Sequence, residues 1–203
     1  MSLLAEGLKA HFPSAALDAL GKAQVGVAGA GGLGSNVAML LVRSGVRHLR
    51  VADHDRLEPS NLNRQCYWPE DVGRPKVEAL RERLLTLEPG LCFDARQVCI
   101  RPETACALFL GCDIVVEALD EAPIKASLCS SLLAGGFYVV AASGIAGYGL
   151  QPMQARRMGD SFVCVGDFTS AVDEAMPPLA PRVMQAAAMQ ADAVLGRILS
   201  GIM

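Results

Sequence analysis

The chain has 203 residues, of which 52% are hydrophobic and 19% are charged, and its formal net charge is −3. This length and composition suit one sizeable buried core, so we expect a single domain spanning residues 1–203 rather than two full domains. Because the balance of charge is slightly acidic and the basic residues are scattered, nucleic acid is not an expected partner.

The chain contains seven cysteines and no Cys-x-x-Cys pair. This pattern argues against a disulfide framework and a four-cysteine zinc site, so we predict no structural zinc and a reducing cytoplasmic location. The first residues, Met1–Glu6, lack the basic start of a signal peptide. Residues 126–155 carry no charge, but pairs such as Gly135-Gly136 break them into short elements, which favours a buried sheet over a membrane span.

Apolar residues at helical spacing over 3–20 predict one or two short helices interrupted at Pro13. A strand over 24–28, a glycine loop over 29–34, a helix through Val42 and a strand over 46–52 together form a βαβ unit. Residues 54–75 follow as a long polar loop, and a loop of that length inside a compact domain is usually functional.

A helix is predicted from Pro75, with Val77, Leu80, Leu84 and Leu87 on one face. The alternation then continues with strands over 91–98, 113–119 and 137–142 and helices over 102–110 and 121–134. Residues 145–166 predict a strand pair outside that rhythm, 166–178 a mobile loop, and 182–199 a closing helix. The predicted fold class is α/β, with a Rossmann-like, mostly parallel sheet flanked by helices and a short antiparallel extension near the C-terminus.

The glycine loop contains Gly29, Gly31, Gly32 and Gly34, which would let backbone N–H groups approach phosphate oxygens at a helix N-terminus. An acidic residue, Asp53, ends the next strand, where a nucleotide ribose would be bound. The alternative is a tight structural turn. We expect Asp55 to shape the following loop.

The long loop carries a polar cluster that a dinucleotide fingerprint does not require, namely Ser60, Asn61, Arg64, Gln65 and, just beyond it, Lys76. Arg64 offers a planar fork and Lys76 a point charge, so together they could hold a triphosphate and stabilise charge at its α-phosphate. This favours ATP and adenylyl transfer. Taken singly, Arg64 is better explained as a solvated loop arginine and Lys76 as a lysine at a helix N-terminus.

Asp120 is predicted to end a buried strand at the same sheet edge as the glycine loop and Asp53. A lone carboxylate there suits Mg²⁺, which takes one or two carboxylates together with phosphate oxygens. The alternative is a helix N-cap. Cys164 could be a nucleophile, but its apolar neighbours favour the buried face of a strand.

In their order and spacing, Gly29 to Ser35, Asp53 to Asp55, Ser60 to Gln65, Gly73 to Lys76 and Asp120 resemble the ThiF/MoeB/HesA family. The resemblance implies an enzyme that uses ATP to adenylate the C-terminal Gly-Gly carboxylate of a ubiquitin-like sulfur carrier and releases pyrophosphate. It places Gly32 against the phosphates, Asp53 on the ribose, Asp120 on Mg²⁺, and Asn61, Arg64, Gln65 and Lys76 on the phosphates. The C-terminal part resembles the compact ThiF branch, which implies a ThiS-like carrier and thiamine biosynthesis.

The chain departs from the family's longer members, since the zinc cysteines and an evident carrier-bonding cysteine are absent and no arginine precedes Arg43. Lys9 or Lys22 could replace the N-terminal arginine, and Lys125 stands where an arginine often follows the metal-binding aspartate. The apolar composition predicts a homodimer. Two alternatives stay open: an NAD-binding oxidoreductase, permitted by the glycine loop and Asp53, and a non-catalytic carrier-docking scaffold.

Overall fold

The computed structural model describes residues 2–173 and 175–200. Its helices are α1 (Leu3–Lys9), α2 (Ser14–Lys22), α3 (Gly32–Arg43), α4 (Lys76–Leu87), α5 (Ala105–Leu108), α6 (Ala122–Ala134) and α7 (Ala180–Leu199). Short 3₁₀ turns lie at η1 (Pro59–Asn61), η2 (Pro69–Asp71) and η3 (Pro102–Thr104). The strands are β1 (Gln24–Ala28), β2 (His48–Ala52), β3 (Cys92–Arg96), β4 (Ile114–Glu117), β5 (Tyr138–Ala142), β6 (Gln154–Arg157) and β7 (Phe162–Gly166).

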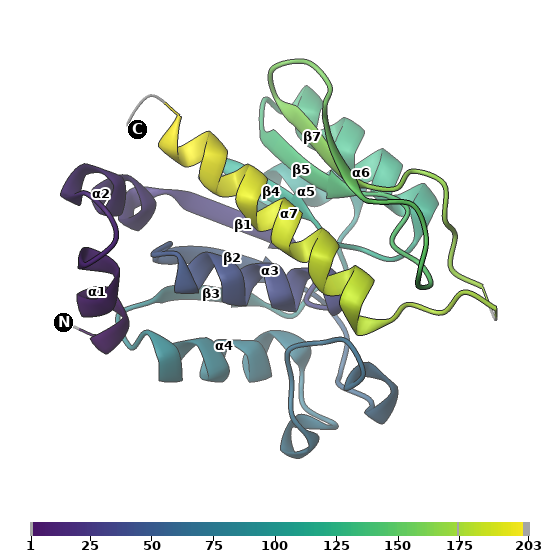
Figure 1. Cartoon of the computed structure of the whole chain (residues 1–203), viewed down its shortest axis with the longest axis horizontal. Coiled ribbons are helices and arrows are strands. Elements are labelled where there is room, and N and C mark those ends of the chain that lie inside the picture. Colours follow the sequence, from purple (N-terminus) through teal and green to yellow (C-terminus); the bar gives the residue numbers. More distant parts are fainter. Residues whose placement is uncertain (1, 174, 201–203) are drawn as a thin grey trace.

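The strands form one seven-stranded sheet in the order β3-β2-β1-β4-β5-β7-β6 (Figure 1). All neighbours pair in parallel except β6, which runs antiparallel to β7 at the edge of the sheet. This arrangement confirms the predicted Rossmann-like α/β fold and its antiparallel extension. In the described ranges, no helix has the length and apolar character needed to cross a membrane.

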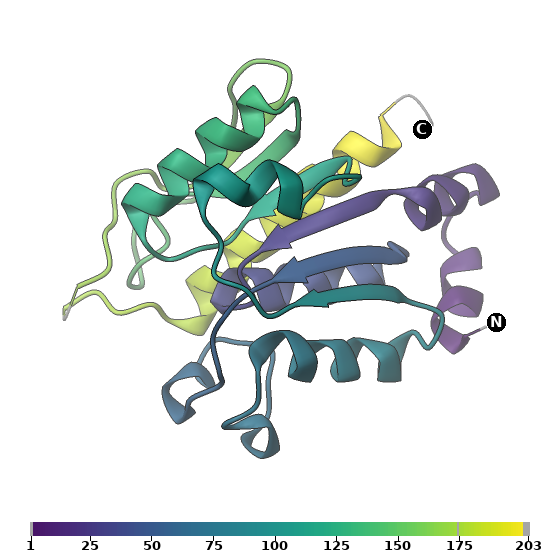
Figure 2. The ribbon, with the colours of Figure 1, turned by 180° about the vertical axis from the view of Figure 1, so that it is seen from behind.

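Two hydrophobic layers sandwich the sheet. On one face, α3, α4 and α7 cover an apolar core that includes Val27, Val51 and Val116. On the other face, α5 and α6 cover β4 and β5, while β1, β2 and β3 are open to view (Figure 2). The apolar stripes predicted for α4 and α7 both face the first layer, with Leu80 and Val194 fully buried.

The element boundaries differ from the sequence predictions at the ends. Helix α3 begins at Gly32, inside the predicted loop, and α7 begins at Ala180 because Pro181 fits the first turn, where a backbone N–H is not required. Strand β4 ends at Glu117, so Asp120 lies three residues beyond the strand instead of at its end.

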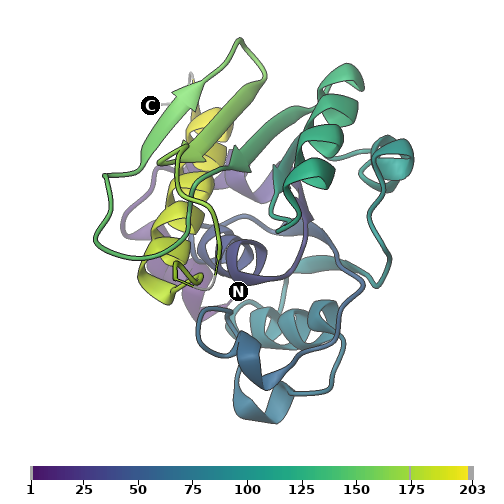
Figure 3. The ribbon, with the colours of Figure 1, turned by 90° about the vertical axis from the view of Figure 1, so that its right-hand side faces the viewer.

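The carboxyl ends of the parallel strands meet at one edge of the sheet, which faces the viewer in Figure 3. Three connections gather there: the glycine loop after β1, the long loop after β2 and the turn after β4. Strands β1 and β4 are neighbours in the sheet, and the helices that follow them cover opposite faces, so this edge is the topological switch point where α/β sheets bind ligands.

A buried ion pair fixes the segment that joins β7 to α7. The Arg182 guanidinium donates to Asp167 Oδ2, and the side chains are 8% and 1% exposed. Asp167 Oδ1 accepts the N–H groups of Thr169 and Ser170, both at 2.8 Å. Burial by itself would raise the pKa of Asp167, but these hydrogen bonds outweigh it and hold the pKa below its ordinary value. The start of the predicted mobile loop is therefore anchored to the core.

We predict that Asp167→Asn lowers the free energy of unfolding by about 3 kcal/mol at pH 7, because Arg182 is left buried without its counter-charge. Since the folded-state pKa of Asp167 is depressed, its stabilisation is present above the unfolded pKa of about 3.9 and is lost as the pH falls through the folded value. Urea unfolding at pH 7 and pH 3 should show the difference from wild type shrinking at the lower pH.

The exposed Asp160, in the turn between β6 and β7, provides the matched control. Asp160→Asn should change the unfolding free energy little at either pH. A difference for Asp167→Asn that is independent of pH would show that the carboxylate charge is not what stabilises this connection.

Candidate nucleotide-binding site

Two glycines of the loop are required by packing. Gly29 has a φ of +104°, and a Cβ there would lie 2.7 Å from the carbonyl oxygen of Ala118. At Gly34 a Cβ would lie 1.8 Å from the carbonyl oxygen of Gly29, a separation that no side chain tolerates. These glycines let the first turn of α3 pack directly onto the loop.

Of the other two glycines, Gly31 faces away from such contacts and Gly32 is closely packed. A Cβ on Gly31 would meet only Gln65 Nε2 at 3.8 Å, an ordinary van der Waals distance, while a Cβ on Gly32 would lie 3.0 Å from Val183 Cγ1. The lack of a side chain at Gly31 therefore has no explanation in the protein's own packing. It leaves the N-terminus of α3 accessible, where N–H groups and the helix dipole favour an anion.

Asp53 ties the glycine loop to the end of β2. Its Oδ2 accepts the N–H of Ala30 at 2.6 Å and its Oδ1 accepts the N–H of Asp55 at 2.8 Å. The Tyr67 hydroxyl adds a second tie to the loop by donating to the carbonyl of Ala30 at 2.7 Å. Each carboxylate oxygen has a second lone pair, so the predicted ribose contact remains chemically possible.

Lys76 is a buried cation at this edge. Its side chain is 8% exposed, and its Nζ lies 2.7 Å from Oδ2 of Asp55. Lys76 is also the first residue of α4, so its alternative interpretation as a lysine at a helix N-terminus stays open beside the phosphate role. One of the three ammonium donors is used by Asp55, which leaves the others for a ligand.

Arg64 packs beside the N-terminus of α3. A Cβ on Gly32 would lie 3.4 Å from Arg64 Cγ, and the side-chain amide of Asn36 donates to the carbonyls of both Gly32 and Arg64. The guanidinium itself bonds within its own loop, to the Ser60 carbonyl at 3.3 Å and to Asn63 Oδ1 at 2.8 Å. Arg64 is thus held next to the glycine loop, with its Nη1 partly engaged.

The remaining residues of the polar cluster separate into two kinds. Asn61 Oδ1 accepts the N–H of Glu58, and Ser60 Oγ donates to the Glu58 carboxylate, so both shape the turn η1. Gln65 is 7% exposed, and among the described residues its Oε1 has no hydrogen-bond partner. The other amide atom of Gln65, Nε2, faces Gly31 and is a donor that a phosphate oxygen could accept from.

Asp120 is exposed in the turn beyond β4 and has no hydrogen-bond or ion-pair partner within residues 2–173 and 175–200. The helix N-cap interpretation is wrong, because Glu121 occupies the N-cap position of α6. A free carboxylate is suited to a magnesium ion. Asp53, His54 and Asp55 form a second group of possible metal ligands, with one ligand atom from each lying within 4.8 Å of the others. The ion pair with Lys76 already neutralises the Asp55 carboxylate of this group.

Several contacts of the site were not predicted. Tyr67 and Asn36 organise the loop. Tyr67 lies in the long polar loop and gave no sequence signal, whereas Asn36 is a polar group inside an otherwise apolar segment. Glu117, fully buried at the end of β4, is another such residue. The Asn36 amide and the Tyr67 hydroxyl bond Arg64 and Ala30, which lie 28 and 37 residues away, and Glu117 bonds Lys125 on the following helix, so the chain alone did not identify these contacts.

The cysteines near this edge are not activated. Cys164 is 7% exposed on β7, as predicted for a buried strand residue, and burial raises the pKa of its thiol. Burial also raises the pKa of Cys129 to about 12. Because a thiol becomes nucleophilic only as the thiolate, neither group is suited to attack at neutral pH.

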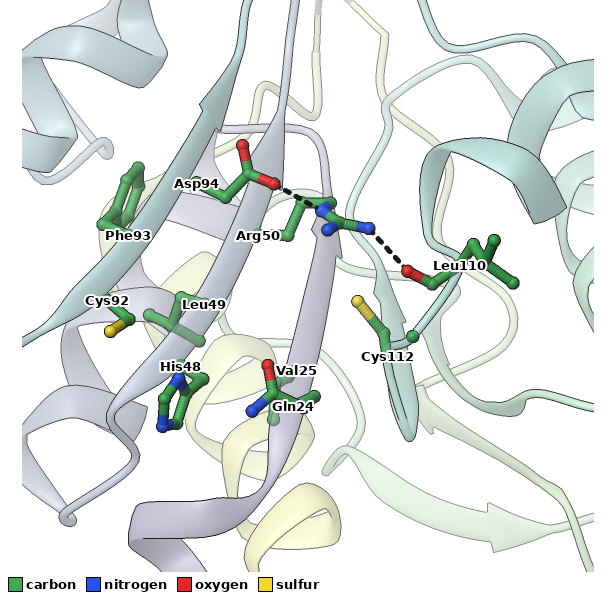
Figure 4. A pocket seen from close by; sticks show the side chains of 11 residues that line it. Gln24, Val25, His48, Leu49, Arg50, Cys92, Phe93, Asp94, Leu110 and Cys112 are labelled. Carbon is green, nitrogen blue, oxygen red and sulfur yellow. Dashed lines mark hydrogen bonds and ion pairs between the residues drawn. The ribbon is translucent and has the colours of Figure 1, made fainter.

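A hollow of about 450 Å³ lies elsewhere, over the amino halves of β1, β2 and β3 (Figure 4). There Arg50 Nε bonds Asp94 Oδ2 at 2.7 Å, and Arg50 Nη1 donates to the carbonyl of Leu110 at 2.8 Å. Its walls come from the open face of the sheet, so it is separate from the glycine loop at the carboxyl ends.

The sequence profile of the ThiF family matches residues 5–201. The chain belongs to the ThiF family. This confirms the resemblance drawn from the motifs, and it covers nearly the whole chain.

Curated relatives carry different names. A sulfur carrier protein adenylyltransferase from Thermus thermophilus is 42% identical over 107 residues, which are 52% of this chain and 40% of that protein. The ThiS adenylyltransferase of Escherichia coli is 32% identical over 64% of this chain and 52% of its own length. A tRNA threonylcarbamoyladenosine dehydratase from Saccharomyces cerevisiae is 36% identical over 63% of this chain. The chain spans only 30% to 52% of these relatives' lengths.

Solved structures share the fold. The E. coli tRNA N6-threonylcarbamoyladenosine dehydratase TcdA in complex with ATP superimposes with a TM-score of 0.86 at 19% identity, covering 97% of this chain and 94% of that one. E. coli MccB with ATP gives a TM-score of 0.72 at 23% identity, covering 90% and 57%. At these identities the likeness concerns the architecture.

The contrast between the glycines gives a direct test of the ThiF-family loop. Gly34→Ala should lower the free energy of unfolding by at least about 2 kcal/mol, because its Cβ would collide with the Gly29 carbonyl. Gly31→Ala should change stability by less than about 1 kcal/mol and yet weaken ATP binding at least tenfold. Chemical denaturation and calorimetric titration measure the two effects. Normal ATP affinity in Gly31→Ala would indicate that the loop does not approach phosphates.

Proposed function

We propose that this ThiF-family protein is an ATP-dependent adenylyltransferase that acts on the C-terminal Gly-Gly carboxylate of a ubiquitin-like sulfur carrier. The observation that carries the proposal is the placement of Lys76, a buried ammonium held at the same sheet edge as an open helix N-terminus. A triphosphate needs this concentration of positive charge, and a redox dinucleotide does not. The names of the T. thermophilus and E. coli relatives support the same activity.

In the proposed reaction, a carrier carboxylate oxygen attacks the α-phosphorus of ATP, the bond from that phosphorus to the β-phosphate bridging oxygen breaks, and pyrophosphate leaves. Negative charge grows on the phosphate oxygens along this path. Lys76 and Arg64 would stabilise that charge, and the N-terminus of α3 would hold the phosphates next to Gly31 and Gly32. Asp53 would accept the ribose hydroxyls with the lone pairs left free by Ala30 and Asp55.

The hydrogen-bonding groups of Gln65, Asn61 and Ser60 suggest a role for each residue. A phosphate oxygen can only accept, so Gln65 would present its amide N–H groups to the phosphates and its unsatisfied Oε1 to a donor group. Asn61 and Ser60 would act through the shape of the loop, since their side chains bond Glu58 and each other.

Asp120 is the residue that would hold Mg²⁺, because it is exposed at the correct edge and without a partner among the described residues. When bound, Mg²⁺ would neutralise phosphate charge and orient the leaving pyrophosphate. No step requires a cysteine, because the nucleophile is the carrier's carboxylate.

The alternatives make different demands. A dehydratase acting on tRNA, suggested by the S. cerevisiae relative, would need to bind a polyanion, whereas this chain has a net charge of −3. An NAD-binding oxidoreductase would leave Arg64 and Lys76 without a ligand.

We further propose a ThiS-like carrier in thiamine biosynthesis as the finer assignment, and a homodimer as the functional unit.

Ligand choice can be measured with the one tryptophan of the chain. Trp68 lies on the long loop, 46% exposed, with the Arg83 guanidinium 4.4 Å from its ring centre. Titration of ATP with Mg²⁺ should change the Trp68 fluorescence with higher affinity than titration of NAD⁺, because only ATP presents a triphosphate to Arg64 and Lys76. Tighter binding of NAD⁺ would overturn the adenylation proposal.

Residue roles can be measured by pyrophosphate exchange in the presence of a ThiS-like carrier. Arg64→Ala and Lys76→Met should each lower the exchange rate at least tenfold, which corresponds to about 1.4 kcal/mol of barrier, because each removes a stabilising charge. Arg197→Met, which removes an exposed cation near the amino end of β4, should keep the wild-type rate and serves as the control. Near-normal exchange in both site variants would assign them to the loop surface.

A tRNA arm completes the experiment. Pyrophosphate release from ATP should depend on the carrier and not on added tRNA. Stimulation by threonylcarbamoyladenosine-modified tRNA, with no response to the carrier, would favour the dehydratase alternative.

A further inference from the structure

A second lysine, Lys125 in the first turns of α6, closes a hydrogen-bonded ring with the turn after β4. Its Nζ donates to the carbonyl of Leu119 at 2.8 Å and to Glu117 Oε1 at 3.0 Å, and lies 2.8 Å from Glu117 Oε2. Glu117 Oε1 also accepts the N–H of Leu119 at 2.7 Å. Both backbone polar groups of Leu119 are therefore held by one ion pair.

This ion pair lies inside the protein. Glu117 is fully buried, and the Lys125 side chain is 18% exposed. Burial raises the pKa of the Glu117 carboxyl, and the Lys125 charge opposes that shift. A buried pair is weak as a source of stability, since apolar residues of similar volume often do as well. The contribution of this pair therefore depends on the backbone of Leu119, which it holds.

Helix α7, on the opposite face of the sheet, also contacts the end of β4. Gln190 of α7, also fully buried, donates its side-chain amide to the carbonyl of Glu117 at 2.9 Å and to that of Val140 at 3.4 Å. The β4–β5 pairing ends at Val116 and Val140, so these carbonyls lie where the ladder stops. Side chains from both helix layers thus fix the exit of β4.

That exit touches the glycine loop. The Ala118 N–H donates to the carbonyl of Ala28 at 2.8 Å, and the Ala118 carbonyl is the group that excludes a side chain at Gly29. Asp120 follows directly on Leu119 and has no partner of its own within the described ranges. The location of its carboxylate is therefore set by the backbone that Lys125 holds.

We propose that Lys125 is a positioning residue, which fixes the turn 118–120 through Leu119 and Glu117 so that Asp120 presents its carboxylate beside the glycine loop. Lys125 does not contact the reactants, because its donors reach Glu117 and the Leu119 carbonyl. The catalytic consequence rests on the proposed function, in which Asp120 binds the metal of the nucleotide complex. The structural part does not.

The experiment compares four variants. Lys125→Met removes the donors and keeps the stem, and Lys125→Arg keeps a charge and donors. The double variant Glu117→Gln/Lys125→Met avoids an unpaired buried carboxylate, so that it folds even if the single variant does not. Arg197→Met, which removes an exposed cation in the last turn of α7, is the matched control.

The first measurement is hydrogen exchange of the Leu119 amide in nucleotide-free protein. Exchange should accelerate at least tenfold in Lys125→Met and in the double variant, with amides in the middle of β4 unchanged, and it should return to within about threefold of wild type in Lys125→Arg. Unchanged Leu119 exchange in both Met variants would overturn the inference, whether or not the protein has the proposed activity.

The second measurement is carrier-dependent pyrophosphate exchange as a function of ATP and Mg²⁺. The Met variants should lower kcat at least tenfold and raise the Mg²⁺ concentration needed for half-maximal rate, with the KM for ATP within about twofold. Wild-type kcat in variants whose Leu119 amide exchanges faster would overturn the catalytic consequence. If wild type shows no exchange activity at all, the proposed function fails, and Leu119 exchange still decides what Lys125 holds.

Discussion

The constraint on which the rest of this structure depends is the contact between two backbones at the start of α3. The Gly29 carbonyl occupies the space that a side chain on Gly34 would fill, and Gly29 in turn lies against the Ala118 carbonyl. Because no side chain separates these backbones, the glycine loop, the N-terminus of α3 and the turn after β4 lie in direct contact. Asp53 and Arg64 are in turn tied to this backbone contact, through the Ala30 N–H and through Asn36 respectively.

The charges around this layer are arranged as pairs in which one partner keeps spare bonding capacity. Lys76 uses one donor on Asp55, and Asp53 uses one lone pair of each oxygen on the backbone. Such pairing lowers the cost of burying ionised groups. It also means that a ligand would bind to groups already oriented, since little side-chain entropy remains to be lost.

The periodic elements were predictable because their signals are local. The apolar stripes of α4 and α7, the buried run of β5 and the glycine loop each follow from residues close in the sequence, and the structure confirms them. What the sequence did not reveal involves partners far along the chain. Lys76 is buried because Asp55 reaches it across 21 residues. The N-cap role that was the alternative for Asp120 is taken by its neighbour Glu121, because helical spacing does not fix the first residue of α6. Hydrophobic spacing contains no information about such polar contacts, which depend on how loops close after the sheet has formed.

The sheet ends in β6, whose four residues, Gln154–Arg157, are all exposed and whose outer edge has no neighbouring strand among the described residues. An unpaired edge is a template for adding a strand from another molecule. Here the edge carries Arg156 and Arg157 in succession, and Arg156 is stacked 3.9 Å above the ring of Phe168. A second copy approaching this edge in register would bring like charges together and would have to displace that stacked guanidinium. The edge strand β6 therefore opposes fibrous self-association. Such protection helps an otherwise apolar chain to stay dispersed at high concentration.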